Sequence, residues 1–135
     1  MIHKKQNVSL HEYNMYKYVY NLQIIQIPRI IYYNKKSQIL YTEKINNMCI
    51  ADLYGEQPEN IDNDLFEKCQ LIIKKLYKYN ILYRDITAYN FIEDNNIVWL
   101  IDFEHCCFKT NKYNDDEDFI KKFINGLNEW NPNFL

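Results

Sequence analysis

Residues 82–92 read LYRDITAYNFI, and residues 97–104 read IVWLIDFE. Both segments contain short apolar runs, typical of buried strands, with polar positions where the runs end. The polar side chains Asp85, Asn90 and Asp102 fall at these ends. The polar residues between the two segments predict a β-hairpin, which would return Asp102 beside the other two. We therefore expect these three oxygen-bearing side chains to converge on one point.

This combination of side chains suits metal-dependent phosphoryl transfer. Hard cations such as Mg²⁺ take oxygen ligands, and they usually bind one or two carboxylates together with phosphate oxygens and water. Asn90 and Asp102 are the candidate metal ligands, while Asp85 would orient an acceptor hydroxyl and accept its proton. The alternative is that all three are turn residues at strand ends, where aspartate and asparagine are favoured.

The order Asp85, Asn90 and then Asp102-Phe103 resembles the catalytic loop and metal-binding motif of the protein-kinase-like superfamily. Within it, the segments DITAYN and VWLID are most similar to the atypical RIO kinases and to the small kinase of the KEOPS tRNA-modification complex. The resemblance implies a phosphotransferase that uses ATP and Mg²⁺ or Mn²⁺. It assigns Asp85 as the catalytic base, with Arg84 before it, and Asn90 and Asp102 as the metal ligands.

The chain before this motif is similar to the family in its order of elements. By resemblance, Glu12 on the first helix would pair with a phosphate-binding lysine. Lys4 and Lys5 are the candidates for that lysine, and both lie closer to Glu12 in the sequence than the family usually places it. A strand hairpin then leads into an adenine-contacting hinge at residues 43–47. The resemblance therefore implies nucleotide contacts from Glu43, Lys44, Ile45 and Asn46, in addition to Glu12 and Lys5.

The sequence also departs from the family pattern. Tyr83 stands where typical kinases have histidine, and Glu104 replaces the glycine of the Asp-Phe-Gly motif. Glutamate at that position also occurs in choline-kinase-like and antibiotic-kinase-like enzymes, so the acceptor is either a protein serine or threonine or a small-molecule hydroxyl. The two glycines, Gly55 and Gly126, cannot form a Gly-rich phosphate loop. The resemblance therefore implies a minimal form shortened at its N-terminus.

Local patterns predict an α+β protein with a minimal kinase-like fold in a single domain. A reduced N-terminal lobe, residues 1–45, would hold a helix and a β-hairpin, and a mainly helical C-terminal lobe would span residues 46–135. Ser9 and Glu12 form a capping-box pattern at the start of the first helix. The expected helices span residues 10–22, 50–55, 64–78 and 116–130, and the expected strands span residues 30–33, 38–41, 81–83, 91–92 and 97–101.

Several patterns have a structural interpretation. Tyr13, Tyr16 and Tyr20 share one helix face and are expected to pack on the core rather than to stack on nucleic-acid bases. The lysines of helix 64–78 are expected to form a solvated face rather than a binding patch. Trp99 should be buried, because its neighbours in the strand are apolar.

Three further segments are expected to carry no chemistry. Residues 57–60 should be a loop, and the acidic residues 115–118 should be a solvated helix N-terminus, where negative charge is favourable. The run His105-Cys106-Cys107 has contiguous rather than spaced ligand types, which argues against a zinc site.

Composition argues against several classes of function. The chain has 16 Lys and Arg against 18 Asp and Glu, for a net charge of −2, which gives no electrostatic footprint for nucleic acid. The apolar runs are far shorter than the roughly 20 residues that a bilayer requires. The four cysteines lack C-x-x-C spacing and no signal peptide is evident, which predicts reduced thiols and a cytoplasmic location. We therefore expect no direct nucleic-acid or membrane partner.

Three functional hypotheses remain open. The first is a minimal ATP–Mg²⁺ phosphotransferase. The second is a catalytically inactive pseudokinase that binds a nucleotide or a protein. The third is a fragment completed by a separate polypeptide that supplies Gly-rich strands. The missing strands would leave a sheet edge exposed, so a protein partner or self-association is expected to cover it.

Overall fold

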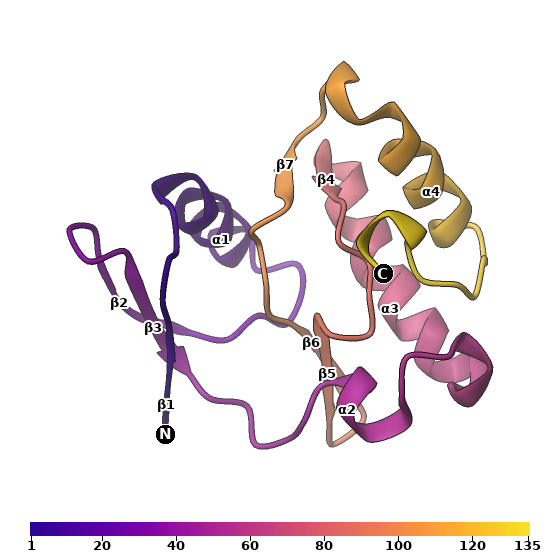
Figure 1. Cartoon of the computed structure of the whole chain (residues 1–135), viewed down its shortest axis with the longest axis horizontal. Helices are drawn as coiled ribbons and strands as arrows, with labels where there is room; N and C mark the ends of the chain where they lie inside the picture. The colour runs from indigo at the N-terminus through magenta and orange to yellow at the C-terminus, as the bar shows by residue number, and fades with distance from the viewer.

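The computed structural model describes all 135 residues of the chain. Its N-terminal part is a three-stranded antiparallel sheet with one helix, and its C-terminal part combines helices with two short strand pairs. The helix α1 (Leu10–Leu22) lies between the sheet and the C-terminal part (Figure 1). This mixed architecture is compatible with the predicted α+β class. None of its helices has the length and apolarity needed to cross a bilayer.

The helix α1 begins where the sequence predicts. The Ser9 hydroxyl accepts a hydrogen bond from the Glu12 N–H at 3.1 Å, which satisfies one of the free donors of the first turn. Tyr16 is buried, and Tyr13 stacks on Tyr33 of the sheet with ring centroids 4.2 Å apart. The prediction that the tyrosine face packs on the core is confirmed.

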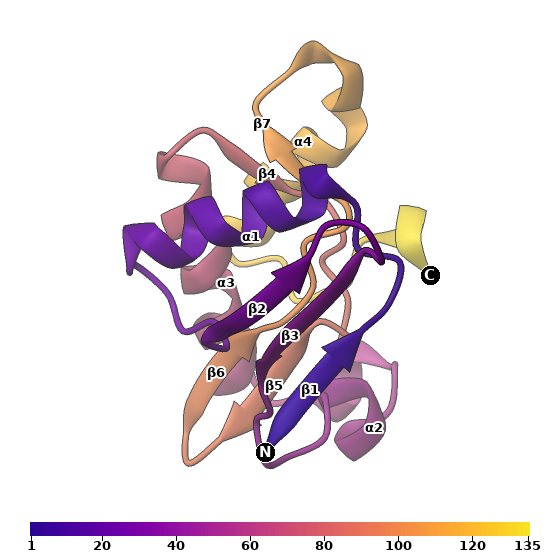
Figure 2. The ribbon, with the colours of Figure 1, turned by 90° about the vertical axis from the view of Figure 1, so that its left-hand side faces the viewer.

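The N-terminal sheet has the strand order β1–β3–β2, which Figure 2 shows side by side. The strand β1 (Ile2–Lys5) pairs with β3 (Ile39–Glu43), and β3 pairs on its other side with β2 (Ile30–Asn34). The hairpin of β2 and β3 is the predicted one. The strand β1 corrects the prediction of a helix and a hairpin alone, because its short polar sequence becomes extended through pairing with β3.

The C-terminal part follows the predicted order of elements. The long helix α3 (Asn63–Lys78) begins at Asp62, whose carboxylate accepts from the Leu65 N–H at 2.8 Å. The other elements are α2 (Ile50–Tyr54), β4 (Ile81–Tyr83), β5 (Phe91–Asp94), β6 (Ile97–Leu100), β7 (Cys106–Phe108) and α4 (Asn114–Ile124), with the 3₁₀ turns η1 (Pro58–Asn60), η2 (Asn111–Tyr113) and η3 (Pro132–Phe134). The strand β5 pairs with β6, and β4 pairs with the unpredicted strand β7.

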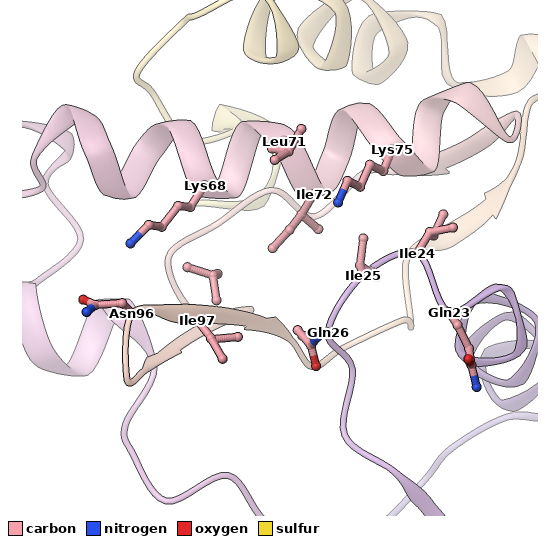
Figure 3. Close-up of a pocket in the computed structure, with 11 residues that line it drawn as sticks. Gln23, Ile24, Ile25, Gln26, Lys68, Leu71, Ile72, Lys75, Asn96 and Ile97 are labelled. Carbon is pink, nitrogen blue, oxygen red and sulfur yellow. The ribbon is translucent and has the colours of Figure 1, made fainter.

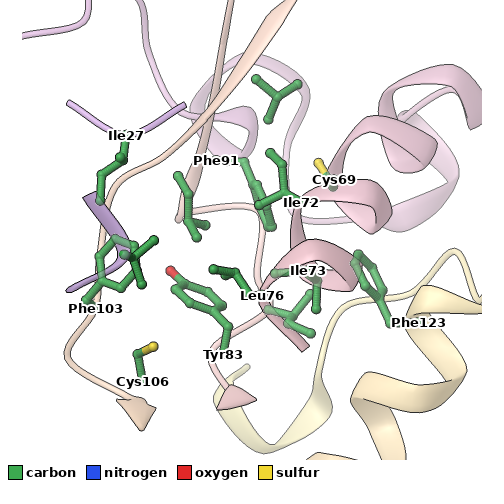
Figure 4. Packing of buried hydrophobic residues seen from close by; sticks show 14 of the residues in the cluster. Ile27, Cys69, Ile72, Ile73, Leu76, Tyr83, Phe91, Phe103, Cys106 and Phe123 are labelled. Atoms are coloured by element: carbon green, nitrogen blue, oxygen red, sulfur yellow. The ribbon is translucent and has the colours of Figure 1, made fainter. Parts of the chain in front are cut away.

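One hydrophobic core joins the two parts of the molecule. Figure 4 shows the buried face of α3, with Ile73 and Leu76, beside Tyr83 of β4. The ring of Phe103 meets the Tyr83 ring edge to face, with centroids 5.6 Å apart, and meets the Tyr16 ring of α1 at 5.1 Å. Phe103 therefore connects α1 to β4 directly beside Asp102.

Two predictions near the C-terminus need correction. The helix α4 ends at Ile124 rather than near residue 130, because Gly126 adopts a φ of +107° that a continuing helix does not allow. Trp130 nevertheless packs in the core, with its ring centroid 4.8 Å from that of Phe66. The apolar spacing from α4 to Trp130 therefore indicates burial and not helix. In addition, the predicted loop 57–60 contains the single turn η1.

Trp99 is not a core residue. It is half-buried, whereas Val98 and Leu100 on either side are buried. Successive side chains of a strand point to opposite faces, so Trp99 lies on the less covered face of β6. It lines a surface cavity together with Arg29.

The acidic residues 115–118 are not only a solvated helix N-terminus. Asp116 and Glu117 are buried. Glu117 accepts a hydrogen bond from the Tyr77 hydroxyl at 2.6 Å and lies 3.3 Å from the Lys109 ammonium. These partners come from other elements, so the run ties α4 to the rest of the molecule instead of only favouring the helix dipole.

Candidate functional site

The loop after β4 holds Asp85 in a network of short-range hydrogen bonds. The Asp85 carboxylate accepts from the Thr87 hydroxyl at 3.1 Å, and the Asn90 side-chain N–H donates to the Asp85 carbonyl at 2.8 Å. Burial raises the pKa of Asp85 above its ordinary value, and the negative charge of Asp102 acts in the same direction. Hydrogen bonding by the Asn90 and Thr87 side chains opposes that rise in pKa.

The β5–β6 hairpin returns Asp102 to this loop. The Ile101 N–H donates to the Asn90 carbonyl at 3.2 Å, and the Tyr83 hydroxyl donates to the Asp102 carbonyl. Asp102 itself caps the following turn, since one of its carboxylate oxygens accepts from the Glu104 N–H at 2.9 Å. The structure therefore brings the segments of Asp85, Asn90 and Asp102 together, while the catalytic and metal-binding roles of these residues stay predictions.

A single ammonium group links three elements at this place. The Lys5 Nζ lies 2.5 Å from the Glu12 carboxylate and 3.2 Å from the Asp102 carboxylate. Lys5 ends β1, Glu12 lies in the first turn of α1, and Asp102 follows β6. We call these residues the Lys5 triad. The contact between Lys5 and Glu12 is the one expected from the family resemblance.

Burial and charge shape the protonation of this triad. Burial raises the pKa of Glu12, and the hydrogen bond and positive charge of Lys5 oppose that rise. For Lys5, burial by itself lowers the pKa, but the carboxylates of Asp102 and Glu12 outweigh burial and leave the pKa raised. Both carboxylates therefore favour a charged Lys5 at neutral pH.

A cavity of about 400 Å³ opens beside the triad. It lies between the N-terminal sheet, the β3–α2 connector and the loop that follows β6. Lys5 and Asp102 line it, and Tyr89 and Ile92 line its other side. The remaining lining residues are His3, Pro28, Thr42, Glu43, Lys44, Ile45, Asn47, Met48, Cys49, Asp52 and Ile101.

Of the predicted hinge, residues 43–47, all but Asn46 line this cavity. The backbone N–H of Ile45 makes no hydrogen bond within the chain, so it is free to donate to a ligand. The Lys44 N–H is engaged with the Met1 carbonyl at 3.0 Å, and the Glu43 carboxylate accepts from the Arg29 N–H at 2.8 Å. The backbone of the connector therefore offers a better contact than the Glu43 side chain.

The oxygen atoms available near Asp102 fit a magnesium ion. One Asp102 carboxylate oxygen is occupied by Lys5 and Glu104, and the other has no hydrogen-bond partner. The Asn90 side-chain N–H donates to the Asp85 carbonyl, while the Asn90 side-chain oxygen has no hydrogen-bond partner. No group of three or more His, Cys, Asp and Glu side chains that could hold a metal is present. The donor set is thus one carboxylate and one amide oxygen, which suits a cation that also takes phosphate oxygens and water.

The Arg84 side chain contacts residues outside the cavity. Its guanidinium lies over the Tyr113 ring, 3.6 Å from the centroid, and 3.5 Å from the Asp116 carboxylate. The Arg84 side chain does not line the cavity. These contacts connect the loop before Asp85 to the C-terminal segment, and the predicted catalytic role of Arg84 stays a prediction without a contact to support it.

The residue that anchors the backbone on both sides of Asp85 was not predicted from the sequence. Asn131 is fully buried, its side-chain N–H donates to the Arg84 carbonyl at 2.8 Å, and its backbone N–H donates to the Ile86 carbonyl at 2.9 Å. The same side chain donates to Asp116 at 3.1 Å. No local pattern marks Asn131, because its partners lie in distant parts of the sequence.

Comparison with known proteins indicates the fold of the chain. The sequence matches no protein-family model and no curated protein. Among solved structures, the chain is similar to the Rio2 kinase–ADP/Mg²⁺–phosphoaspartate complex from Chaetomium thermophilum, with a TM-score of 0.62 and 12% identity. The match covers 87% of this chain and 36% of that chain. This chain has a kinase-like fold. It spans little more than a third of the Rio2 chain, and the similarity shows the fold alone.

Proposed function

We propose that the chain is an ATP- and Mg²⁺-dependent phosphotransferase whose site lies between residues 1–45 and 46–135. The Lys5 triad carries the proposal, because an ammonium between a helix carboxylate and Asp102 is placed to receive phosphate oxygens beside a cation. The cavity of about 400 Å³ is within the range of small-ligand sites, roughly 300–1,000 Å³. The Rio2 neighbour, which was solved with ADP and Mg²⁺, supports the choice of nucleotide and metal.

In this proposal the adenine ring lies along the β3–α2 connector and accepts a hydrogen bond from the free Ile45 N–H. Asn90 and Asp102 hold the magnesium ion, which when bound would neutralise phosphate charge. Lys5 binds phosphate oxygens and is oriented by Glu12. Asp85 accepts the proton of the acceptor hydroxyl, and its partly buried carboxylate, with a raised pKa, suits a general base.

The acceptor is a protein serine or threonine or a small-molecule hydroxyl. The acceptor would approach Asp85 from outside the cavity, because Asp85 does not line it. Tyr89, 47% exposed and in contact with Glu56, lies on the cavity wall in the same loop and would border the approaching acceptor.

A second candidate is nucleotide binding without turnover. No glycine lines the cavity, so no Gly-rich backbone covers the place proposed for the phosphates. The contact from Lys5 to Asp102 also engages the proposed metal-binding carboxylate. Both features favour a pseudokinase that binds the nucleotide but no longer catalyses phosphoryl transfer.

A paired experiment separates the two candidates. Calorimetric titration of Mg²⁺·ATP measures binding, and release of labelled phosphate or autophosphorylation measures turnover. The phosphotransferase proposal predicts turnover that Asp85→Asn lowers roughly 10²- to 10⁴-fold while binding is kept. The variant Asp118→Asn, at an exposed position of α4, is the matched control and should leave both unchanged. Binding without turnover supports the pseudokinase, and absence of binding contradicts both.

A further inference from the structure

A second cavity, of about 270 Å³, lies away from the Lys5 triad. Figure 3 shows it between α3, the connector from α1 to β2 and the β5–β6 hairpin. We call it the α3 groove. It is lined by Gln23, Ile24, Ile25, Gln26, Lys68, Leu71, Ile72, Lys75, Asn96, Ile97 and Val98.

The α3 side of the groove is a regular stripe. Lys68, Leu71, Ile72 and Lys75 follow the spacing i, i+3, i+4, i+7, which places them on one face of the helix. Two cations therefore bracket two aliphatic side chains. In Figure 3 the side chains of Lys68 and Lys75 extend from α3 toward the β5–β6 hairpin.

The apolar part of the groove is partly open to solvent. Leu71 is 51% exposed and Ile97, on the opposite bank, is 46% exposed. Ile72 and Val98 are buried behind them and form an aliphatic floor. Exposed aliphatic side chains beside a hollow are a feature of interaction sites.

The charge of the groove has one sign. None of its lining residues is acidic, and Lys75 makes no ion pair within the chain. Lys68 lies 3.6 Å from Asp64, but that pair is an exposed i,i+4 contact, which is weak and easily exchanged for another carboxylate. An adjoining cavity shares Gln23, Ile25 and Gln26 with the groove, and it contains one residue of each charge, Arg29 and Glu43, so the single sign of charge is confined to the groove itself.

We propose that the α3 groove binds an extended acidic segment of a partner protein, with an aliphatic side chain seated between two carboxylates. Lys68 and Lys75 are separated by two helical turns, or roughly 10 Å along the axis. In an extended chain, residues i, i+2 and i+4 lie on one face, and positions i and i+4 are about 13 Å apart, a separation that two flexible lysine side chains can meet. The segment should therefore carry two acidic residues four positions apart, with a leucine, isoleucine or valine midway between them on the same face.

The lining argues against other ligands. No aromatic side chain lines the groove, although aromatic stacking is the usual means of binding single-stranded nucleic acid. The volume lies below the usual range for small-molecule sites, roughly 300–1,000 Å³. The proposal assigns a binding role to Lys68 and Lys75 in place of the solvated-face interpretation, and it does not depend on ATP binding.

The test uses the full chain and a fluorescein-labelled nonapeptide with two aspartates four residues apart and a leucine midway between them. Fluorescence anisotropy should show saturable binding, and the double variant Lys68→Glu/Lys75→Glu should weaken it at least tenfold. The matched control Lys74→Glu/Lys78→Glu makes the same charge change at exposed positions of α3 outside the groove and should change the affinity less than twofold. Circular dichroism verifies that all variants are folded.

Two further probes define the chemistry. A peptide with lysines in place of the aspartates should bind Lys68→Glu/Lys75→Glu better than it binds the parent chain. A peptide with serine in place of the leucine should bind at least fivefold more weakly than the original. The proposal is overturned by no binding at 1 mM peptide, by equal losses in the two double variants, or by tighter binding of a labelled oligouridine than of the peptide.

Discussion

Asn131 donates a side-chain hydrogen bond to the Arg84 carbonyl at 2.8 Å across 47 residues of sequence, and its backbone N–H donates to the Ile86 carbonyl at 2.9 Å. The two carbonyls flank Asp85, so one buried residue fixes the backbone on both sides of the proposed base. Arg84 in the loop, Asp116 in α4 and Asn131 near the C-terminus therefore form one unit, although they lie far apart in the sequence.

We expect Asn131→Ala to destabilise the fold by about 1–3 kcal/mol, because it removes two hydrogen bonds of a fully buried side chain, one to the Arg84 carbonyl and one to the Asp116 carboxylate. Urea denaturation measures the loss. Asn125→Ala, at an exposed position whose side chain donates only to Lys121, should change the free energy of unfolding by less than about 0.5 kcal/mol. Equal effects of the two variants would contradict the role given to Asn131.

The contact between Lys5 and Glu12 should appear as a coupling energy. Lys5→Met leaves the nearly buried Glu12 carboxylate without its cation, while Glu12→Gln removes the charge that Lys5 faces. A double-mutant cycle measured by urea denaturation should give a coupling of about 1–3 kcal/mol. Replacing the exposed neighbour Lys4 by methionine is the matched control and should show no coupling to Glu12→Gln.

Replacing the proposed base Asp85 should raise stability while it lowers activity. Because burial raises the pKa of Asp85, the folded state holds its proton more tightly than the unfolded state does. Its contribution to stability is present below the ordinary pKa of 3.8 and is lost as the pH rises through the raised pKa. At pH 7, Asp85→Asn should therefore increase the urea midpoint while it removes turnover.

The raised pKa of Asp85 also determines where the turnover rate falls at acid pH. Turnover requires a deprotonated Asp85, so the rate should fall as the pH drops through a value above 3.8. A rate that stays constant down to pH 3.8 would argue against Asp85 as the base.

Alkaline pH should destabilise the fold through buried tyrosines. Burial raises the pKa of Tyr83 and of Tyr16 well above 10, while both ionise near 10 in the unfolded chain. The unfolded state therefore loses these protons first, and stability falls as the pH rises above 10, at up to about 1.4 kcal/mol per pH unit for each such group. The raised pKa of Lys5 acts in the same direction above its ordinary value of 10.5.

Urea midpoints between pH 8 and pH 11 measure this effect. Tyr16→Phe should reduce the slope, because it removes one group whose pKa differs between the two states. Tyr18→Phe, at an exposed position of α1, should leave the slope unchanged. A slope that Tyr16→Phe does not alter would exclude burial of Tyr16 as the cause.

The parts of the fold that follow local rules could be predicted from the sequence. Ser9 and the buried stripe of α3 define their helices, and the β-branched and aromatic runs define the hairpins. The strand β1 could not be predicted, because it is short and polar and exists through pairing with β3. The end of α4 was wrong, because apolar spacing continues to Trp130 after the chain has turned at Gly126.

The candidate site, too, could be predicted only in part from the sequence. Asp85, Asn90 and Asp102 carry an ordered motif, so their convergence could be expected, and Lys5 and Glu12 follow from the family order. The burial of Asp116 depends on Asn131 and Arg84, which lie far from it in sequence. Nothing in one sequence reports such contacts, since each partner looks like an ordinary surface residue.

The central proposal is that a divalent cation and nucleotide phosphates bind beside Lys5, Asn90 and Asp102, while Glu12 orients Lys5 and Asp85 meets the acceptor from outside the cavity. Titration of Mn²⁺·ATP into the ¹⁵N-labelled chain tests it directly, because the paramagnetic ion broadens the amide signals nearest to it. We predict selective loss of the signals of Lys5, Asn90 and Asp102, while Lys68 and Lys75 of the α3 groove keep theirs. Persistence of the first set of signals at saturating Mn²⁺·ATP, or their uniform loss with the second set, would contradict the account.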